Sequence, residues 1–335
     1  MNTDDPMGGR GAVTTPLPPI RQTFRLLAPY LCLIAVFFLF SVFGPSAFHS
    51  AYNLKTLLTQ SVIVGIGALG MTFVIISGGI DLSVGSILAL STVLMARILA
   101  LNPDPDRWLV WMAVGSAVIL GALCGLFNGL LVARLRIMPF IATLGTMQIF
   151  RGIAKWLAHE QTVTAPITWI NSLMEIDPLP SWVLLAPGVW IMLILGLIVA
   201  GVLRFTLFGR HTYAIGSNET AARFCGIPVI RQRLWIYATG GAFAGMAGAM
   251  QFANLTLGDP TAAEGMELDI IAAVVIGGGS LRGGEGRASG SLTGAVLMTV
   301  LRNGCNMVGI ANYMQNIVVG AIIISAVAFD RLRTR

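Results

Sequence analysis

Residues 57–77 read LLTQSVIVGIGALGMTFVIIS and contain no charged side chain. A helix of roughly 20 apolar residues is long enough to cross the hydrocarbon core of a bilayer. The segment GIGALG at 65–70 matches the GxGxxG pattern of dinucleotide-binding sites, but such a site needs a strand before the glycines and an amphipathic helix after them. Inside an apolar run, small residues instead let the backbones of neighbouring helices approach closely. The stretch therefore predicts a tightly packed membrane helix.

The same kind of run recurs along the chain. Of the 335 residues, 56% are hydrophobic and only 11% are charged, whereas soluble globular proteins carry roughly 25% charged residues. This composition excludes a disordered chain, a nucleic-acid-binding module and an ordinary cytosolic enzyme. The candidate spans lie at 26–43, 57–77, 83–100, 108–133, 139–158, 182–203, 234–253, 267–279, 288–308 and 312–329. We expect an all-α polytopic membrane protein with about ten transmembrane helices.

One of these runs is too short to cross a bilayer alone. It covers 267–279 and ends in three consecutive glycines, so we expect it to be re-entrant or bent. Segments 71–90 and 271–297 also resemble each other, because each is an apolar run followed by a glycine-rich break and a small-residue helix. Transport proteins are often built from internal repeats, and the similarity predicts one here.

The basic residues predict the orientation. Cytoplasmic loops of membrane proteins carry an excess of lysine and arginine. If the N-terminus is inside and the spans alternate, the inner segments hold Arg10, Arg21, Arg25, Arg134, Arg136, Arg204, Arg210, Arg223, Arg231, Arg233, Arg282, Arg287, Arg331, Arg333 and Arg335, which are 15 of the 21 basic residues. We therefore expect both termini in the cytoplasm. The expected organisation is a disordered cytoplasmic tail at 1–25, a single transmembrane domain at 26–329 and a cytoplasmic C-terminal tail at 330–335.

The residue types needed for chemistry are scarce. Neither of the two lysines, Lys55 and Lys155, follows a glycine, so the GxxxxGK[ST] phosphate-binding loop is absent and any use of ATP must occur on another chain. The four cysteines and three histidines show no metal or redox spacing. We expect no catalytic residue, no cofactor and no metal on this chain. The net charge of +6 is explained by basic inner loops rather than by a nucleic-acid partner.

The predicted inner segment 204–233 reads RFTLFGRHTYAIGSNETAARFCGIPVIRQR. From Ser217 it predicts an N-cap and a short helix closed by Gly226, after which Pro228 blocks continuation. Such a helix between two spans can plug into a groove on a motor subunit and transmit movement, and the alternative is an ordinary basic loop. Ala221 and Ala222 leave little bulk, so the helix could sit deep in that groove. The candidate coupling residues are Ser217, Asn218, Glu219, Ala221, Ala222, Arg223 and Gly226.

Four motifs together resemble one family. They are GGIDLSVGS at 78–86, RIMPFIATLGTMQIFRG at 136–152, AIGSNETAARFCGI at 214–227 and ELDIIAAVVIGGGSLRGGEG at 267–286. In this order they look like the permease subunit of bacterial monosaccharide ABC importers of the ribose type. The resemblance implies a multi-pass protein of the bacterial inner (plasma) membrane that works with a second permease copy or close relative, two ABC ATPase subunits that bind ATP and magnesium, and a periplasmic sugar-binding protein. It also places 217–226 at the position of the family's coupling helix, and it leaves the sugar open.

Glycine-rich inner turns form a second candidate region for energy coupling, made of Gly78, Gly79, Asp81, Gly278, Gly279, Gly283 and Gly284. A carboxylate facing lipid is costly, so Asp81 is expected to cap the next helix near Ser83 or to pair with an arginine, with a gate or motor contact as the alternative. Amides within the runs either hydrogen-bond between helices or line a pore. The pore candidates are Asn128, Gln148, Asn303 and Asn306.

A different class of transporter remains as the alternative function. A stand-alone secondary carrier driven by an ion gradient needs titratable or cation-coordinating groups at the middle of the bilayer. No aspartate or glutamate falls in the middle of a predicted span. The sequence therefore favours an ATP-driven importer subunit that performs no chemistry of its own.

Overall fold

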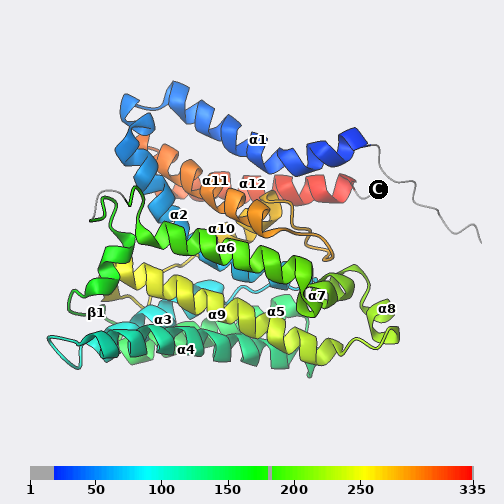
Figure 1. Cartoon of the computed structure of the whole chain (residues 1–335), viewed down its shortest axis with the longest axis horizontal. Helices are drawn as coiled ribbons and strands as arrows, with labels where there is room; N and C mark the ends of the chain where they lie inside the picture. Colours follow the sequence, from blue (N-terminus) through cyan, green and yellow to red (C-terminus); the bar gives the residue numbers. More distant parts are fainter. Residues whose placement is uncertain (1–18, 180–182, 334–335) are drawn as a thin grey trace, which may run out of the picture.

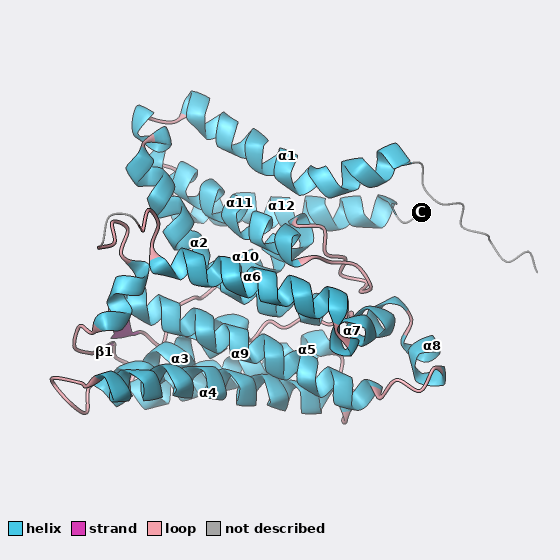
Figure 2. Cartoon of the chain, in the orientation of Figure 1, coloured by secondary structure: helices cyan, strands magenta, loops and turns pink. Residues whose placement is uncertain are grey.

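The computed structural model describes residues 19–179 and 183–333, which form a bundle of roughly parallel and antiparallel helices (Figures 1 and 2). The elements are α1 (Pro19–Phe43), η1 (Ser46–His49), α2 (Ala51–Ile76), α3 (Val84–Leu99), α4 (Arg107–Ala133), α5 (Pro139–Ala158), β1 (Val163–Thr164), η2 (Trp169–Met174), α6 (Pro187–Phe205), α7 (Leu207–Ser217), α8 (Glu219–Phe224), α9 (Val229–Leu255), β2 (Leu257–Gly258), α10 (Met266–Ile276), α11 (Ala288–Met307) and α12 (Asn312–Arg333). The mostly helical fold confirms the predicted all-α class.

Every predicted apolar run contains a helix in the described part of the chain, and α2, α4 and α6 are each long and apolar enough to cross a membrane. The run at 267–279 contains α10, which has only 11 residues. At 1.5 Å per residue α10 is about 16 Å long, roughly half the thickness of a hydrocarbon core. The helix is therefore as short as the sequence predicted, too short to cross a bilayer alone.

Helix α2 lies at the centre of the bundle, and 94% of its most apolar window is buried. It packs against α6, α9, α10 and α11. Glycines on α2 leave space for neighbouring side chains, because a Cβ at Gly67 would lie 2.7 Å from Cδ1 of Ile270. The GIGALG segment therefore has the packing role predicted from the sequence.

Glycines also bring α4 and α9 into backbone contact. A Cβ at Gly121 would overlap the carbonyl oxygen of Gly241, and one at Gly245 would overlap the carbonyl oxygen of Ala117. Contacts between α10 and α11 are of the same kind, with Gly290 against Gly277. Without a hydrophobic driving force inside lipid, helices associate through such close packing, so these glycines determine which helices are neighbours.

Two predicted boundaries differ in the structure. Helix α1 begins at Pro19, so residues 19–25 of the expected disordered tail are helical, and residues 1–18 lie outside the described residues. Proline suits the first turn of a helix because its missing N–H has no partner there anyway. At the other end, α12 continues to Arg333 and takes in most of the expected tail at 330–335.

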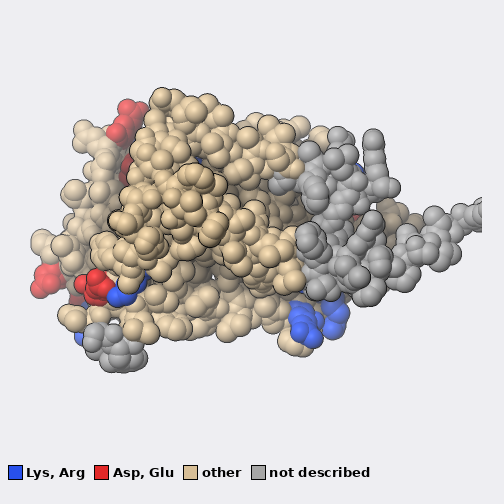
Figure 3. All heavy atoms as spheres, turned by 90° about the horizontal axis from the view of Figure 1, so that it is seen from above, with Lys and Arg blue, Asp and Glu red and all other residues tan. Residues whose placement is uncertain are grey.

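The two ends of the bundle differ. One end carries the short antiparallel pair β1–β2, in which Val163 pairs with Gly258. The opposite end carries α7 and α8 (Figure 1). Figure 3 shows acidic side chains gathered at the β1 end, whereas basic side chains lie at both ends. Below, these are called the β1 end and the α8 end.

Candidate functional site

Helix α8 is a short helix at the α8 end, as the sequence predicted. Its N-cap is Asn218, whose side-chain oxygen accepts a hydrogen bond of 2.9 Å from the backbone N–H of Ala221. The prediction that the cap begins at Ser217 is wrong, because Ser217 is the last residue of α7. Asparagine is as good an N-cap as serine, so the pattern alone did not distinguish these neighbours.

The C-terminus of α8 closes at Gly226, as predicted. Gly226 has φ +78°, a left-handed conformation that glycine adopts without steric cost. Its N–H donates to the carbonyl of Arg223, and the N–H of Ile227 donates to the carbonyl of Ala222. These two bonds form the Schellman motif that commonly ends a helix.

Glu219 connects α8 to α9. It accepts from Arg223 on its own helix at 2.6 Å and from Arg233 on α9. Burial alone would raise the pKa of Glu219, but the hydrogen bonds and positive charges of the two arginines hold it below its usual value. The expected pair of Glu219 and Arg223 is present, and the contact with Arg233 fixes the direction in which α8 projects.

The exposed face of α8 differs from the expected one. Ala222 is only 4% exposed and packs against Ile215 and Val229, so it faces the body of the protein and the expectation that it faces a partner groove is wrong. Ala221 and Arg223 are exposed. Phe224 leaves 89% of its surface uncovered. The side chain that α8 presents most fully is therefore an aromatic ring.

The segment before α8 is helical rather than a loop. Gly209 and Gly216 both lie within α7, although glycines in a loop-like segment usually mark its turns. A Cβ at Gly209 would overlap the carbonyls of Val202 and Leu203, and one at Gly216 would overlap the carbonyl of Ile76. These glycines allow close backbone approach rather than ending a helix.

Three glycine-containing segments meet directly behind α8, and we call this contact the glycine junction. It consists of residues 76–78 at the end of α2, residues 216–217 at the end of α7, and residues 282–286 after α10. The N–H of Gly284 donates to the carbonyl of Ile76 at 2.8 Å. A Cβ at Gly283 would lie 2.9 Å from the Cα atoms of both Gly78 and Gly216. The predicted inner turns therefore contact each other and the end of α7.

The turns after α2 and α10 have the same backbone form. Gly78 and Gly278 have φ +80° and +95°. Each donates to the third residue before it, at 2.9 Å in both cases. Gly79 and Gly279 likewise donate to the carbonyls of Val74 and Val274. Both turns are Schellman motifs, which supports the internal repeat predicted from the sequence.

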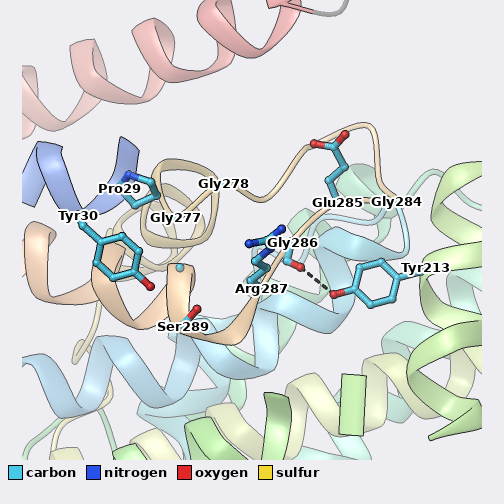
Figure 4. Close-up of a pocket in the computed structure, with 11 residues that line it drawn as sticks. Pro29, Tyr30, Tyr213, Gly277, Gly278, Gly284, Glu285, Gly286, Arg287 and Ser289 are labelled. Carbon is cyan, nitrogen blue, oxygen red and sulfur yellow. Dashed lines mark hydrogen bonds between the residues drawn. The ribbon is translucent and has the colours of Figure 1, made fainter. Parts of the chain in front are cut away.

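A cavity of about 450 Å³ adjoins the glycine junction (Figure 4). Tyr30 on α1 and Arg287 before α11 lie on its walls, together with Tyr213 on α7. The hydroxyl of Tyr213 donates to the carbonyl of Gly286 at 2.7 Å. Burial raises the pKa of Tyr213, although the positive charge of Arg287 opposes this effect. Tyr213 stays neutral at physiological pH and so remains a hydrogen-bond donor that ties α7 to the turn after α10.

Asp81 lies just before α3 and bonds Ser83, the N-cap residue of that helix, although no side chain caps the helix's first turn. Its Oδ1 accepts from the backbone N–H of Ser83 at 2.8 Å and from the Ser83 hydroxyl at 2.6 Å. Asn128 on α4 donates to the Ser83 hydroxyl at 2.7 Å and, less closely, to Asp81. Asp81 and Asn128 are buried. In this structure Asn128 therefore serves as a contact between helices, the alternative to lining a pore.

The other pore candidates lie in three different places. Gln148 is on the exposed face of α5. Asn303 exchanges hydrogen bonds of 3.2 Å with Asn53 at the start of α2. Asn306 accepts from Gln315 on α12 at 2.6 Å and lines a polar cavity beside α10. Only Asn306 of the four candidates lines that cavity.

Several residues that now stand out were missed from the sequence. Phe224 lies inside the predicted coupling helix but is not among the candidate coupling residues. An aromatic residue in a short basic segment could have indicated a partner contact. Tyr213 and Arg233 gain significance only through partners that are distant in sequence, Gly286 and Glu219. Among the described residues no group of histidine, cysteine, aspartate or glutamate side chains is arranged to hold a metal ion.

Comparison with known proteins gives matches along most of the chain. The profile of the family described as "Branched-chain amino acid transport system / permease component" matches residues 53–327. The ribose import permease protein of Bacillus subtilis is 42% identical over 92% of this chain and 93% of its own length. The corresponding ribose import permease of Escherichia coli K12 is 39% identical, covering 91% and 92%. The L-arabinose transport system permease protein of E. coli K12 is 35% identical, covering 91% and 90%. No solved structure matches.

Proposed function

This chain belongs to the permease family described as the permease component of branched-chain amino acid transport systems, and from that premise we propose that it is the transmembrane subunit of an ATP-driven importer of a monosaccharide. The similarity of nearly the whole chain to ribose and L-arabinose permeases carries the proposal. The solute is a pentose such as ribose or a related sugar. A branched-chain amino acid, named in the family's description, is the second candidate.

ATP is hydrolysed on a separate chain in this proposal. The sequence lacks a phosphate-binding loop, so ATP and magnesium bind to two partner ATPase subunits. Their point of attachment is α8, where Phe224 is exposed and Glu219 anchors the helix to α9. The glycine junction behind α8 joins the ends of α2, α7 and α10. Movement of α8 would thereby reach helices in the centre of the bundle.

The membrane arrangement follows from the same residues. The single domain at 26–329 crosses the bacterial inner membrane about ten times, with both termini and the α8 end in the cytoplasm. A binding protein docks at the β1 end, where Glu175 and Asp177 supply acceptors for salt bridges. The sugar passes between two permease copies, or between this chain and a close relative.

The energy source distinguishes the proposal from a secondary carrier. The permease, its copurifying ATPase and a solute-binding protein would be reconstituted in liposomes and supplied with D-ribose, L-arabinose or L-leucine. We expect the liposomes to accumulate a sugar only when ATP is inside them and the sugar and the binding protein are outside. Accumulation of sugar by the permease alone under an ion gradient would contradict the proposal. Accumulation of leucine but of neither sugar would show that the solute is a branched-chain amino acid.

A further inference from the structure

A second cavity, of about 640 Å³, lies beside α10 between α2, α11 and α12. Five carboxamide side chains line it, from Gln60, Asn306, Asn312, Gln315 and Asn316. Polar groups within membrane-spanning segments are costly and usually have a function. Gln315 donates to Asn306 and, less closely, to Asn312, so Gln60 and Asn316 are the two amides of this cavity whose polar groups are available to a ligand.

An ion pair forms part of the cavity wall. Arg302 on α11 donates from Nε and Nη2 to the two carboxylate oxygens of Asp269 on α10, at 2.7 and 2.9 Å. Asp269 is 4% exposed, whereas about a third of the Arg302 side chain is accessible. The bidentate pair compensates its own charges, yet its remaining N–H groups and lone pairs can still bond a ligand.

Helix α10 starts inside the bundle rather than at its surface. The loop before it runs along α3, because a Cβ at Gly85 would lie 2.7 Å from the carbonyl oxygen of Ala263. Gly265 and Met266, at the start of α10, line the cavity. Solute sites of transporters typically lie near the middle of the membrane at such discontinuous helices. The cavity therefore occupies the position at which a permease would hold its solute.

We propose that this cavity binds the solute during its passage and selects an uncharged polyhydroxylated molecule. The inference rests on the proposed function and adds the residues that contact the sugar. A sugar hydroxyl both donates and accepts, and a carboxamide does the same. The exposed carboxylate of Glu264 also lines the cavity; it would repel an anionic solute and can accept a hydrogen bond from a sugar hydroxyl. The open side of so polar a cavity cannot face lipid without cost, so it faces the second permease copy.

Gln60 and Asn316 provide the test, because both side chains are exposed in the single chain and neither hydrogen-bonds to another side chain or backbone group in the described part of the chain. The variants are Gln60→Leu, Asn316→Leu and the double variant. The matched control is Gln251→Leu, which replaces a half-buried amide on α9 outside the cavity. Each would be purified as the complete complex with ATPase and binding protein. Sugar uptake per ATP hydrolysed would be measured in liposomes, together with thermal stability.

We expect each cavity substitution to lower uptake per ATP about threefold and the pair about tenfold, the size of one or two lost hydrogen bonds. Gln251→Leu should stay within about twofold of the parent. If the double-variant protein cannot be produced in the membrane, the uptake of the two single variants decides. Unchanged uptake in the leucine variants of Gln60 and Asn316, with a parent complex that transports sugar, would overturn the cavity assignment alone. A parent complex that transports no sugar would overturn the proposed function and this inference together.

Discussion

Phe224 illustrates how much one side chain contributes at the α8 end. A fully exposed phenylalanine in water is unfavourable, and large exposed apolar groups often anchor a partner. On the same short helix, Ala222 is buried against the body of the protein, whereas Ala221 and Phe224 are exposed. We assign the partner contact to Phe224 and a packing role to Ala222.

Truncation of this ring tests the assignment. Phe224→Ala should weaken retention of the ATPase about thirtyfold or more, because loss of an interface anchor costs about 2 kcal/mol or more. The amount of permease in the membrane should not change, since Phe224 contributes little to the core. Copurification of the ATPase and uptake would be measured together. The matched control is Phe140→Ala, which truncates an exposed phenylalanine on α5. Equal retention in both variants would contradict the role of Phe224.

At the scale of elements, the glycine junction connects helices that are distant in sequence. The ends of α2 and α7 and the turn after α10 approach so closely that side chains would not fit between their backbones. A packed contact of this kind moves as a unit rather than deforming continuously. It is the structural link through which α8 would act on α2 and α10.

A single added methyl group should disturb this link. Gly216→Ala places a Cβ against the carbonyl of Ile76, and overpacking of this kind costs about 1–3 kcal/mol. We expect a lower unfolding temperature in detergent and loss of uptake with ATP hydrolysis retained. Gly145→Ala on α5 is the control, because its Cβ would meet no atom within 4 Å. A Gly216→Ala variant as stable and active as Gly145→Ala would exclude the junction as a coupling element.

At the scale of the whole molecule, the two ends of the bundle have different partners in our proposal. The α8 end carries the exposed ring, the glycine junction and a groove lined by Arg134, Arg223 and Arg231. The β1 end carries most of the loop carboxylates and the ion pair between Lys55 and Asp177. Arginine-rich ends remain in the cytoplasm, so the α8 end should face the ATPase.

Cysteine labelling in intact cells tests this orientation. On a background without Cys32, Cys124, Cys225 and Cys305, a Ser217→Cys variant should resist a membrane-impermeant maleimide until the cells are opened. Asp104→Cys, in the loop between α3 and α4, should react from outside and shows that the reagent works. Reaction of Ser217→Cys from outside would reverse the orientation.

Local sequence alone determined the helical segments, the short α10, the cap at Gly226 and the family. Hydrophobic run length and helix-ending glycines depend on neighbours along the chain, so they can be read without a structure. The four motifs that indicated the family are likewise contiguous stretches of sequence, so they can be recognised without a structure.

Only the tertiary structure decided which face of α8 is exposed, that Gly209 and Gly216 lie inside a helix, and that Asp269 and Arg302 form a pair beside five amides. Each of these depends on residues far apart in sequence that packing brings together. A glycine that breaks a helix and one that admits another backbone look identical in a sequence, and the difference is the neighbour that occupies the space of the missing side chain.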